Sequence, residues 1–445
     1  MTQLKPYPEY KNTGLEWIPQ IPKGWRTTKL KYALQSLNHK RIPLSGEVRS
    51  RMKKSYDYYG ASGIIDKVDD YIFDEELILI GEDGANLYSR SSPLAFLASG
   101  KYWVNNHAHI LKPRQGNNVY FVNLLESIDY TIYISGSAQP KLTQDALSNI
   151  TIIEPPIDEQ YLIAQYIEKK IIEIDLLISD KERLINLLEE KRQALITEKV
   201  TKGLDPNVKM KDSGIEWVGK IPEHWAIIKI KYLFNVKNGG TPKSNTSSYW
   251  DDKGMIWITP EDLSSDGYYI SNSKRKISSE GLENSSATLI SKNSIVLSTR
   301  APIGNIKFVI KEYTTNQGCK SLEKSTDNIN ELYYFYLLKN NKTMLQSMGR
   351  GTTFLELSNR DLSNLKIPVL PLKEMNKIVE VISTINQRVD SLIESQKSAM
   401  KLLKEYRESL IYEAVTGKID LRDYEADAGY NAYEQVAETD AVYKE

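Results

Sequence analysis

Two stretches of the chain carry the same regular alternation of apolar and polar positions. Seam positions return after three and then four residues, and the outer positions are rich in Glu, Lys and Arg. A 3.5-residue period of this kind is typical of a coiled coil. In the first stretch the predicted seam is Ile174, Leu177, Lys181, Leu184, Leu188, Lys191 and Leu195. In the second it is Val389, Leu392, Gln396, Ala399, Leu403, Tyr406 and Leu410.

This periodicity predicts one long helix over 157–206 and another over 372–420. Pro156 and Pro371 stand just before them, where proline is tolerated ahead of a first helical turn. A helix of about 45 residues is roughly 67 Å long at 1.5 Å per residue. Because a whole body of chain separates the helices, they pair most economically with each other, antiparallel. Lys181 and Gln396 share one seam register, where a polar side chain either fixes the alignment or extends to the seam edge.

Each helix is the last part of a unit that occurs twice in the sequence. The first unit opens with a head that contains Gly14, Trp17 and Trp25, and the second head repeats them 200 residues later as Gly214, Trp217 and Trp225. The helices repeat at an offset of 215, as in 175–178 and 390–393. Between these flanks the two bodies are hard to align. For the tryptophans of the heads we favour core packing over DNA contact.

The divergent bodies have the pattern of mixed α/β domains. Short apolar runs bounded by Gly, Asp and Asn indicate strands at 71–73, 77–80, 294–297 and 306–309. The runs 119–125 and 332–338 occupy matching places and indicate short helices. The predicted organisation is head and first body over 1–156, helix over 157–206, head and second body over 207–371, helix over 372–420, and an acidic, disordered tail over 421–445.

Composition is that of a soluble, core-forming protein. Of 445 residues, 40% are hydrophobic and 26% are charged. The single cysteine, Cys319, excludes a disulfide framework and a cluster of thiolate metal ligands. No apolar run reaches the ~18 residues that span a bilayer, and the start of the chain lacks a signal core. We therefore expect a cytoplasmic protein without membrane contact.

The charge is balanced overall but unevenly distributed. Lys plus Arg and Asp plus Glu each number 58, which at first argues against a nucleic-acid partner. The segment 226–370, however, has 19 basic and 13 acidic residues, and 29–54 has eight basic residues and one acidic residue. The first helix and the tail are acidic. Positive charge on the bodies favours contact of both bodies with phosphate.

Sequence motifs for catalysis are missing. There is no Gly-x-x-x-x-Gly-Lys-Ser/Thr phosphate cradle, and 154–157 is not the Asn/Asp-Pro-Pro-aromatic loop of amino-methyltransferases. His107 and His109 could lie on one side of a strand, but further metal ligands are not evident. We predict a non-catalytic chain with no metal site.

Polar and basic side chains that can read base edges or bind phosphate stand on matching loops of the two bodies. In the first body the candidates are Lys40, Arg41, Lys53, Lys54, Tyr59, Ser62, Asn106, His107, Gln139 and Lys141. In the second they are Thr241, Lys243, Asn245, Arg300, Asn316, Gln317, Arg350, Thr352 and Thr353. For any one loop an ordinary turn is the favoured interpretation, whereas for matching sets on two copies the turn and DNA contact are equally supported.

These features resemble the specificity (S) subunit of type I restriction-modification enzymes. The resemblance covers about 10–420 and rests on the repeated heads and on the segments 257–263, 298–304, 362–364 and 415–418. It implies an α+β fold, with two mixed α/β target-recognition domains separated by a pair of long antiparallel coiled-coil helices in a pseudo-two-fold internal repeat. The first body departs from the pattern, since it lacks sequence counterparts of 257–260 and 298–300.

The same resemblance implies the partners. Each target-recognition domain is expected to read half of a split double-stranded DNA site, and the helices to dock two methyltransferase (M) subunits, with restriction (R) subunits in the full complex. No cofactor is expected in this chain; S-adenosylmethionine, ATP and Mg are expected on the partner subunits. Two alternatives stay open: a recognition subunit of a modification-only or type IIB-like complex, and a coiled-coil assembly protein that does not bind DNA.

Overall fold

The structure, a computed structural model, describes residues 5–136, 139–265, 267–300, 302–350 and 355–424. Its contacts divide the chain into two compact units, Met1–Lys181 with Lys397–Glu445, and Glu182–Gln396. Both boundaries fall inside the long helices α6 (Ile157–Lys202) and α11 (Leu372–Val415). Each unit therefore contains half of both helices, whereas the predicted organisation sets each helix apart as a region of its own. Most of the expected acidic tail lies outside the described residues.

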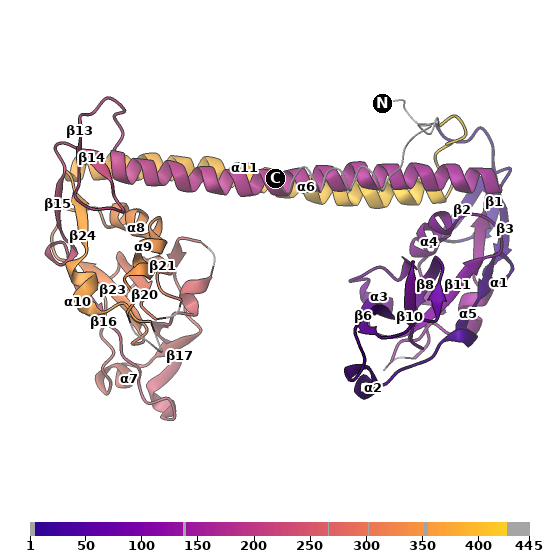
Figure 1. Cartoon of the computed structure of the whole chain (residues 1–445), viewed down its shortest axis with the longest axis horizontal. Coiled ribbons are helices and arrows are strands. Elements are labelled where there is room, and N and C mark those ends of the chain that lie inside the picture. The colour runs from indigo at the N-terminus through magenta and orange to yellow at the C-terminus, as the bar shows by residue number, and fades with distance from the viewer. Residues whose placement is uncertain (1–4, 137–138, 266, 301, 351–354, 425–445) are drawn as a thin grey trace. The chain divides into compact units, whose positions relative to one another are not determined.

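Within each unit the two helix halves lie side by side and antiparallel (Figure 1). In the first unit Ile163 and Val415 share a core cluster, and further along α6 the carboxylate of Asp175 accepts a hydrogen bond from Arg407 Nη1 at 2.7 Å. In the second unit Arg192 makes the corresponding ion pair with Asp390. Because 215 residues separate Asp175 from Asp390 and Arg192 from Arg407, the second unit repeats the ion pair of the first with the helices exchanged.

The seam between the helices differs from the predicted register at alternate positions. Leu177, Leu184, Lys191, Leu392 and Tyr406 were predicted in the seam but are exposed. The neighbouring residues take their places: Ile178, Ile185 and Arg192 in α6, and Ile393, Met400 and Arg407 in α11. The other predicted seam residues are buried or half-buried: Ile174, Lys181, Leu188, Leu195, Val389, Gln396, Ala399, Leu403 and Leu410. Spacing alone could not choose between adjacent apolar residues such as Leu177 and Ile178.

The first unit contains two four-stranded sheets. One has the order β4 (Leu34–Ser36), β11 (Ala108–Pro113), β8 (Leu77–Gly81), β9 (Ala95–Ala98), with all neighbours antiparallel. The other has the order β6 (Gly63–Val68), β5 (Tyr56–Gly60), β10 (Lys101–Val104), β7 (Phe73–Asp74), and its β5 and β10 are parallel. The short helices and 3₁₀ turns of the first unit are α1 (Leu30–Ala33), η1 (Asn38–Lys40), α2 (Gly46–Ser50), α3 (Asn86–Ser89), α4 (Asn118–Glu126), η2 (Thr131–Tyr133) and α5 (Gln144–Asn149).

The second unit has the same plan. A five-stranded sheet has the order β16 (Phe234–Asn238), β23 (Cys319–Lys324), β20 (Ser294–Ser298), β21 (Ile306–Val309), β18 (Tyr269–Ile270). A three-stranded sheet has the order β19 (Arg275–Ile277), β17 (Trp250–Ile258), β22 (Tyr313–Thr315), with β17 and β22 parallel. The short elements are η3 (Ile230–Tyr232), η4 (Ser247–Tyr249), η5 (Asp262–Ser264), α7 (Ser279–Glu283), α8 (Glu331–Lys339), α9 (Lys342–Ser347) and α10 (Asn359–Asn364).

Matching caps begin matching helices in the two units. The Asn117 side chain accepts hydrogen bonds from the first turn of α4, and Asn330 does the same for α8. Thr143 and Ser358, which lie 215 residues apart, cap α5 and α10 in the same way. The predicted helices at 119–125 and 332–338 and the predicted strands at 77–80, 294–297 and 306–309 are confirmed, while 71–73 contributes only its last residue to a strand.

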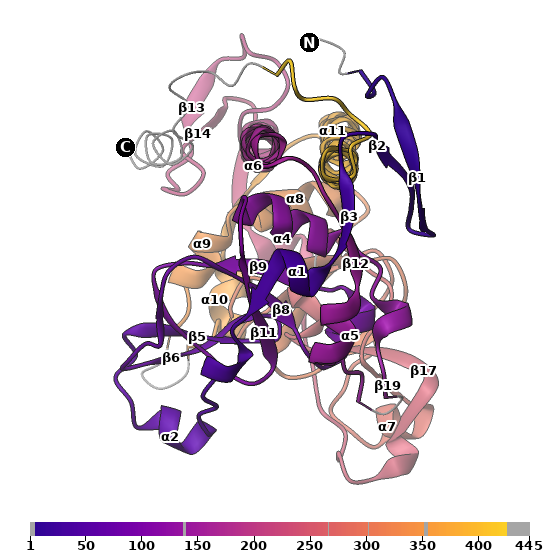
Figure 2. The ribbon, with the colours of Figure 1, turned by 90° about the vertical axis from the view of Figure 1, so that its right-hand side faces the viewer.

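The helices α4 and α8 each attach a body to the pair of long helices. Figure 2 shows α4 between the helix pair and the sheet that contains β8 and β11. The Tyr120 hydroxyl of α4 lies 3.3 Å from the Ile153 carbonyl oxygen and 3.5 Å from that of Val415, at the end of α11. In the second unit Tyr333 of α8 donates to the carbonyl oxygen of Val200, near the end of α6, at 2.8 Å. The position of each body therefore depends on both long helices.

The heads are hairpins that close onto the helices. They consist of β1 (Tyr10–Leu15) with β2 (Ile18–Pro22), and of β13 (Met210–Asp212) with β14 (Lys220–Pro222). Two further strand pairs follow, β3 (Arg26–Lys29) with β12 (Thr151–Glu154), and β15 (Ala226–Lys229) with β24 (Lys366–Val369).

The tryptophans behind these hairpins occupy equivalent places. Trp25 and Trp225 are 1% and 0% exposed, so their assignment to the core is confirmed. Their indole N–H groups donate to Glu159 at 2.8 Å and to Glu374 at 3.2 Å, in the first turns of α6 and α11. Acidic residues are favoured there by the helix dipole. The two junctions therefore have the same geometry.

No helix among the described residues combines the length and apolarity needed to cross a membrane.

Candidate nucleic-acid interface

In the second unit, backbone hydrogen bonds gather several loops at one edge of the large sheet. Thr299 N–H donates to the Gly318 carbonyl oxygen at 2.8 Å, and Leu357 N–H donates to the Thr299 carbonyl oxygen at 2.9 Å. Arg350 and Glu356 exchange both backbone hydrogen bonds, at 3.0 and 2.9 Å. These bonds bring together the segment after β20, the segment between β22 and β23, Arg350 and residues 355–357.

The loop 239–245 joins this cluster at a close approach. A Cβ on Gly239 would lie 2.0 Å from the Asn316 carbonyl oxygen, so a larger residue does not fit there. The Thr241 hydroxyl and the Gln317 side chain are hydrogen-bonded to each other. The predicted residues Thr241, Asn316, Gln317, Arg300 and Arg350 therefore belong to one cluster, which we call the second loop cluster.

The first unit builds the same frame from an unrelated sequence. Glu82 N–H donates to the His107 carbonyl oxygen at 2.8 Å, and Leu142 N–H donates to the Glu82 carbonyl oxygen at 2.8 Å. Ser135 and Lys141 exchange backbone hydrogen bonds at 2.9 and 2.8 Å. In this frame Glu82 is equivalent to Thr299 of the second unit, and Lys141 is equivalent to Glu356. We call residues 82–83, 105–107, 135–136 and 139–141 the first loop cluster.

The turn between the parallel pair and the large sheet also matches. Asn105 N–H donates to the Tyr59 carbonyl oxygen at 3.1 Å, and Asn316 N–H donates to that of Ile258 at 2.9 Å. Both asparagine side chains then accept from the N–H two residues on. The segments 257–260 and 298–300, for which the first body offers no sequence counterparts, have positional counterparts at 58–61 and 81–83.

In the second cluster, basic side chains surround one carboxylate. Glu356 lies 3.2 Å from Arg300 Nε and 3.9 Å from Lys320 Nζ. Lys320 is 7% exposed, and burial lowers its pKa. The 80% exposed Arg350 side chain has its Nε 3.4 Å from Asp361. Lys243 and Asn245 are exposed on the loop 239–245.

In the first cluster the buried group is acidic. The Glu82 carboxylate, 10% exposed, accepts from Arg41 and lies 3.1 Å from Lys141 Nζ. Burial opposes its ionisation, but the Arg41 and Lys141 hydrogen bonds and the nearby His109 lower the pKa of Glu82 below its ordinary value. Asp83 accepts from His107 Nδ1 at 2.8 Å.

Two of the predicted residues, Arg41 and Tyr59, are partly buried and contact other protein groups. The Arg41 side chain is 16% exposed and also donates to the carbonyl oxygens of Asn38 and Ala108, at 3.1 and 3.0 Å. Tyr59 is half-buried and stacks against Phe96. Arg41 and Tyr59 therefore support the loops in this structure, and their contact with DNA stays a prediction.

The remaining predictions are distributed over the surface. Asn106, His107 and Lys141 are exposed in the first cluster, as is Gln139 in the loop that carries Lys141. The exposed residues outside it are Lys40, Lys53, Lys54 and Ser62, of which Lys54 is paired with Asp66 at 2.6 Å. Thr352 and Thr353 lie outside the described residues.

Sequence reasoning missed the acidic members of both clusters. Glu82, Asp83 and Glu356 are acidic and therefore lie outside a pattern of basic and neutral polar side chains. A signal was present, since the 215-residue offset that aligns the helices also aligns Lys141 with Glu356.

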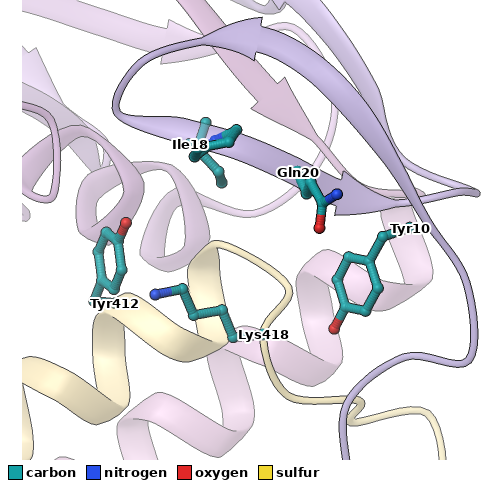
Figure 3. A pocket seen from close by; sticks show the side chains of 6 residues that line it. Tyr10, Ile18, Gln20, Tyr412 and Lys418 are labelled. Carbon is teal, nitrogen blue, oxygen red and sulfur yellow. The ribbon is translucent and has the colours of Figure 1, made fainter.

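Outside the loop clusters, the described residues form a pocket whose side chains have structural contacts. A pocket of about 400 Å³ lies between the first head and the end of α11 (Figure 3). Its Tyr412 hydroxyl donates to the Trp17 carbonyl oxygen at 3.2 Å, and its Lys418 ammonium lies 4.5 Å from the centre of the Tyr412 ring. These groups fasten the hairpin to the helix. Among the described residues, no group of three or more His, Cys, Asp or Glu side chains could hold a metal ion.

Comparison with known proteins gives a family match over most of the chain. The profile of the type I restriction modification DNA specificity domain matches residues 22–187 and 222–401. The chain is 34% identical over 189 residues to the MjaIX type I restriction enzyme specificity subunit of Methanocaldococcus jannaschii, a match that covers 42% of this chain and 43% of that protein.

Two longer matches agree with this one. A putative type I restriction enzyme specificity subunit of Haemophilus influenzae is 25% identical over 397 residues, covering 84% of this chain and 92% of that one. A chain from structural work on complex assembly and conformational transition of the type I R-M system has a TM-score of 0.62 at 15% identity, and the match covers 90% of this chain and 99% of that chain. The last comparison shows a shared fold.

Proposed function

The chain belongs to the family of the type I restriction modification DNA specificity domain, and we propose that it is the DNA-recognition subunit of a type I restriction-modification complex. The observation that carries the proposal is the pair of loop clusters. One backbone frame occurs twice and presents different polar side chains each time. A frame of this kind suits two domains that do the same task on two different DNA sequences.

Each cluster reads one half of a bipartite, asymmetric double-stranded site. The first cluster exposes Lys141, Asn106 and His107, and the second exposes Arg300, Arg350 and Gln317. These are the side chains that read base edges in the major groove and neutralise phosphate. Because the two sets differ, the half-sites differ as well.

The helices carry the features of a surface for a partner that binds twice. Leu177 and Leu392 are each 49% exposed, and Leu187 and Leu402 are 50% and 63% exposed. Each pair is separated by 215 residues, so both copies expose leucine at the same positions. Single exposed leucines are ordinary on a protein surface, so the support comes from their recurrence at equivalent positions of both copies. We assign the site to two methyltransferase subunits, one for each copy.

Catalysis belongs to the partners in this proposal. The sequence has neither a phosphate cradle nor a methyltransferase loop, so methyl transfer with S-adenosylmethionine is assigned to the methyltransferase subunits. ATP- and Mg-dependent cleavage is assigned to restriction subunits that join the full complex.

Reconstitution with the methyltransferase subunits, followed by mapping of methylated adenines in unmethylated DNA, tests the recognition role. We expect methylation only in the complex, at one split sequence with two unlike halves. Methyl transfer by the chain alone, or a complex that forms without sequence-selective methylation, would reject the proposal.

The docking assignment is tested by replacing both Leu177 and Leu392 with Asp. We expect the variant to keep its helicity and to lose stable binding of the methyltransferase subunits, because a carboxylate is placed in an apolar contact on each copy. The matched control replaces Glu190 and Glu405, which are exposed on the helices, with Asp. Normal assembly of the leucine variant would exclude these residues from the interface.

A further inference from the structure

Each loop cluster contains a row of three residues joined by antiparallel bridges. In the second unit Glu356 is bridged to Arg300 on one side and to Arg350 on the other. In the first unit Lys141 is bridged to Asp83 and to Ser135 at the same positions of the frame. Residues paired in an antiparallel bridge project from the same face, roughly 5 Å apart. Each row therefore presents three side chains abreast.

The central residue has opposite charge in the two rows. Glu356 is 38% exposed and Lys141 is 50% exposed, so the carboxylate and the ammonium group both reach the surface. Glu356 lies 3.2 Å from Arg300 Nε and 3.9 Å from Lys320 Nζ, and Lys141 Nζ lies 3.1 Å from Glu82. Lys320 and Glu82 are nine-tenths buried. One row thus holds an acceptor and the other a donor, each near a buried opposite charge that comes from a different position of the frame.

The size of the row suits the major groove. Three side chains about 5 Å apart span roughly 10 Å, and the groove, about 12 Å wide, admits a β-ribbon. A carboxylate can only accept hydrogen bonds, whereas an ammonium can only donate. In the major groove the donors are the amino groups of cytosine and adenine, and the acceptors are O6 and N7 of guanine, N7 of adenine and O4 of thymine.

We propose that Glu356 and Lys141 are specificity-determining residues, with Glu356 selecting a base that presents an exocyclic amino group and Lys141 selecting a base that presents an acceptor. Arg300 lies beside Glu356 and can donate to guanine O6 and N7, so the second row suits a G·C pair with cytosine on Glu356. Lys320 and Glu82 act as positioning residues beneath them. The inference rests on the proposed function and extends it to named base contacts.

The test compares methylated sites made by reconstituted complexes of the whole chain with its methyltransferase subunits. Glu356→Gln keeps the shape of the side chain and adds a donor; Lys141→Gln keeps a donor and adds an acceptor. We expect each variant to lower the discrimination at one base pair of one half-site by about 5- to 150-fold, and to leave the other half unchanged. The two variants should affect opposite halves.

Matched controls come from the heads, where Lys23 pairs with Glu9 at 2.7 Å and Glu223 pairs with Lys209 at 3.2 Å on the surface. Lys23→Gln and Glu223→Gln should leave every position of the site unchanged. Glu356→Gln leaves the buried Lys320 with a weaker partner, so a second variant, Glu356→Ala with Lys320→Met, removes both charges. It should relax the same base pair as Glu356→Gln.

The outcomes separate the two claims. If the unmodified complex methylates no split site, the proposed function is wrong. If it methylates a split site and both Gln variants, together with the double variant, retain that site with unchanged discrimination, the recognition role stands and the assignment of Glu356 and Lys141 is overturned. A change in both half-sites from one variant would also overturn it.

Discussion

The junctions between heads and helices and the loop clusters differ in what the two units have kept. At the junctions both chemistry and geometry repeat: Trp25 donates to Glu159, and Trp225 donates to Glu374. At the loop clusters the backbone frame repeats but the charges do not, since Lys141 stands where Glu356 stands. The junctions have thus kept their side chains in both copies, whereas the loop clusters have kept only their frame, as expected if the two clusters face different ligands.

The largest expected effect is the loss of stability when a junction is broken. Replacing Trp25 or Trp225 with Ala removes a fully buried ring and leaves Glu159 or Glu374 without its indole donor. Each variant should lose about 3–5 kcal/mol of unfolding free energy in its own unit, measured by denaturant unfolding with hydrogen exchange to locate the loss. The losses should be alike, because the junctions are alike.

The control for these variants is a pair of exposed aromatic residues in the same segments. Tyr32 and Tyr232 are 66% and 63% exposed, so replacing them with Ala should change stability by no more than about 0.5 kcal/mol. A large loss from Trp25→Ala with none from Trp225→Ala would show that the junctions are not equivalent.

A smaller expected effect is a difference between the two loop clusters in how their stability depends on pH. His109 is fully buried beside Glu82 and Arg41, and its ring nitrogens contact Asn38 and the Leu142 carbonyl oxygen at 2.8 and 2.7 Å. Burial lowers its pKa below the ordinary 6.5, although the Leu142 hydrogen bond and Glu82 oppose this. The second unit has Lys320 at this place and carries no such histidine.

A lowered folded-state pKa means that the unfolded chain binds the proton more readily. The contribution of His109 to stability is therefore complete above pH 6.5 and is lost as the pH falls from there through the folded-state pKa. Hydrogen exchange should show β11 losing protection as the pH falls below 6.5, while β23 does not. His109→Gln should remove that difference; an unchanged pH response in the variant would assign it to another group.

Much of the architecture could be predicted, and the exceptions have physical causes. The 200- and 215-residue offsets located the heads and helices, because those segments pack against one another in both units and tolerate little change. The bodies could not be aligned, because their frame is held by backbone hydrogen bonds that do not depend on side chains, as at Thr299 and Glu82. The helix seam was misread where Leu and Ile are adjacent, since neighbours in space choose between them.

The candidate site was only partly predictable. The pattern of basic and neutral polar side chains predicted Lys141, Arg300 and Arg350, which the structure places in the loop clusters. Glu356 is acidic and lies outside that pattern, and the guanidinium of the predicted Arg41 is enclosed by protein oxygens. Burial and partners, which sequence does not display, decide whether such a side chain reaches a ligand.

The central claim, that each body reads its own half of a split DNA site, is tested most directly by giving the chain two identical bodies. Residues 226–370 would be replaced by a second copy of 26–155, the heads and helices being kept, and methylated adenines mapped for the complex. We expect a split site made of two copies of the half-site that the first body reads. Retention of the original second half-site in that complex would show that the bodies do not each read their own half.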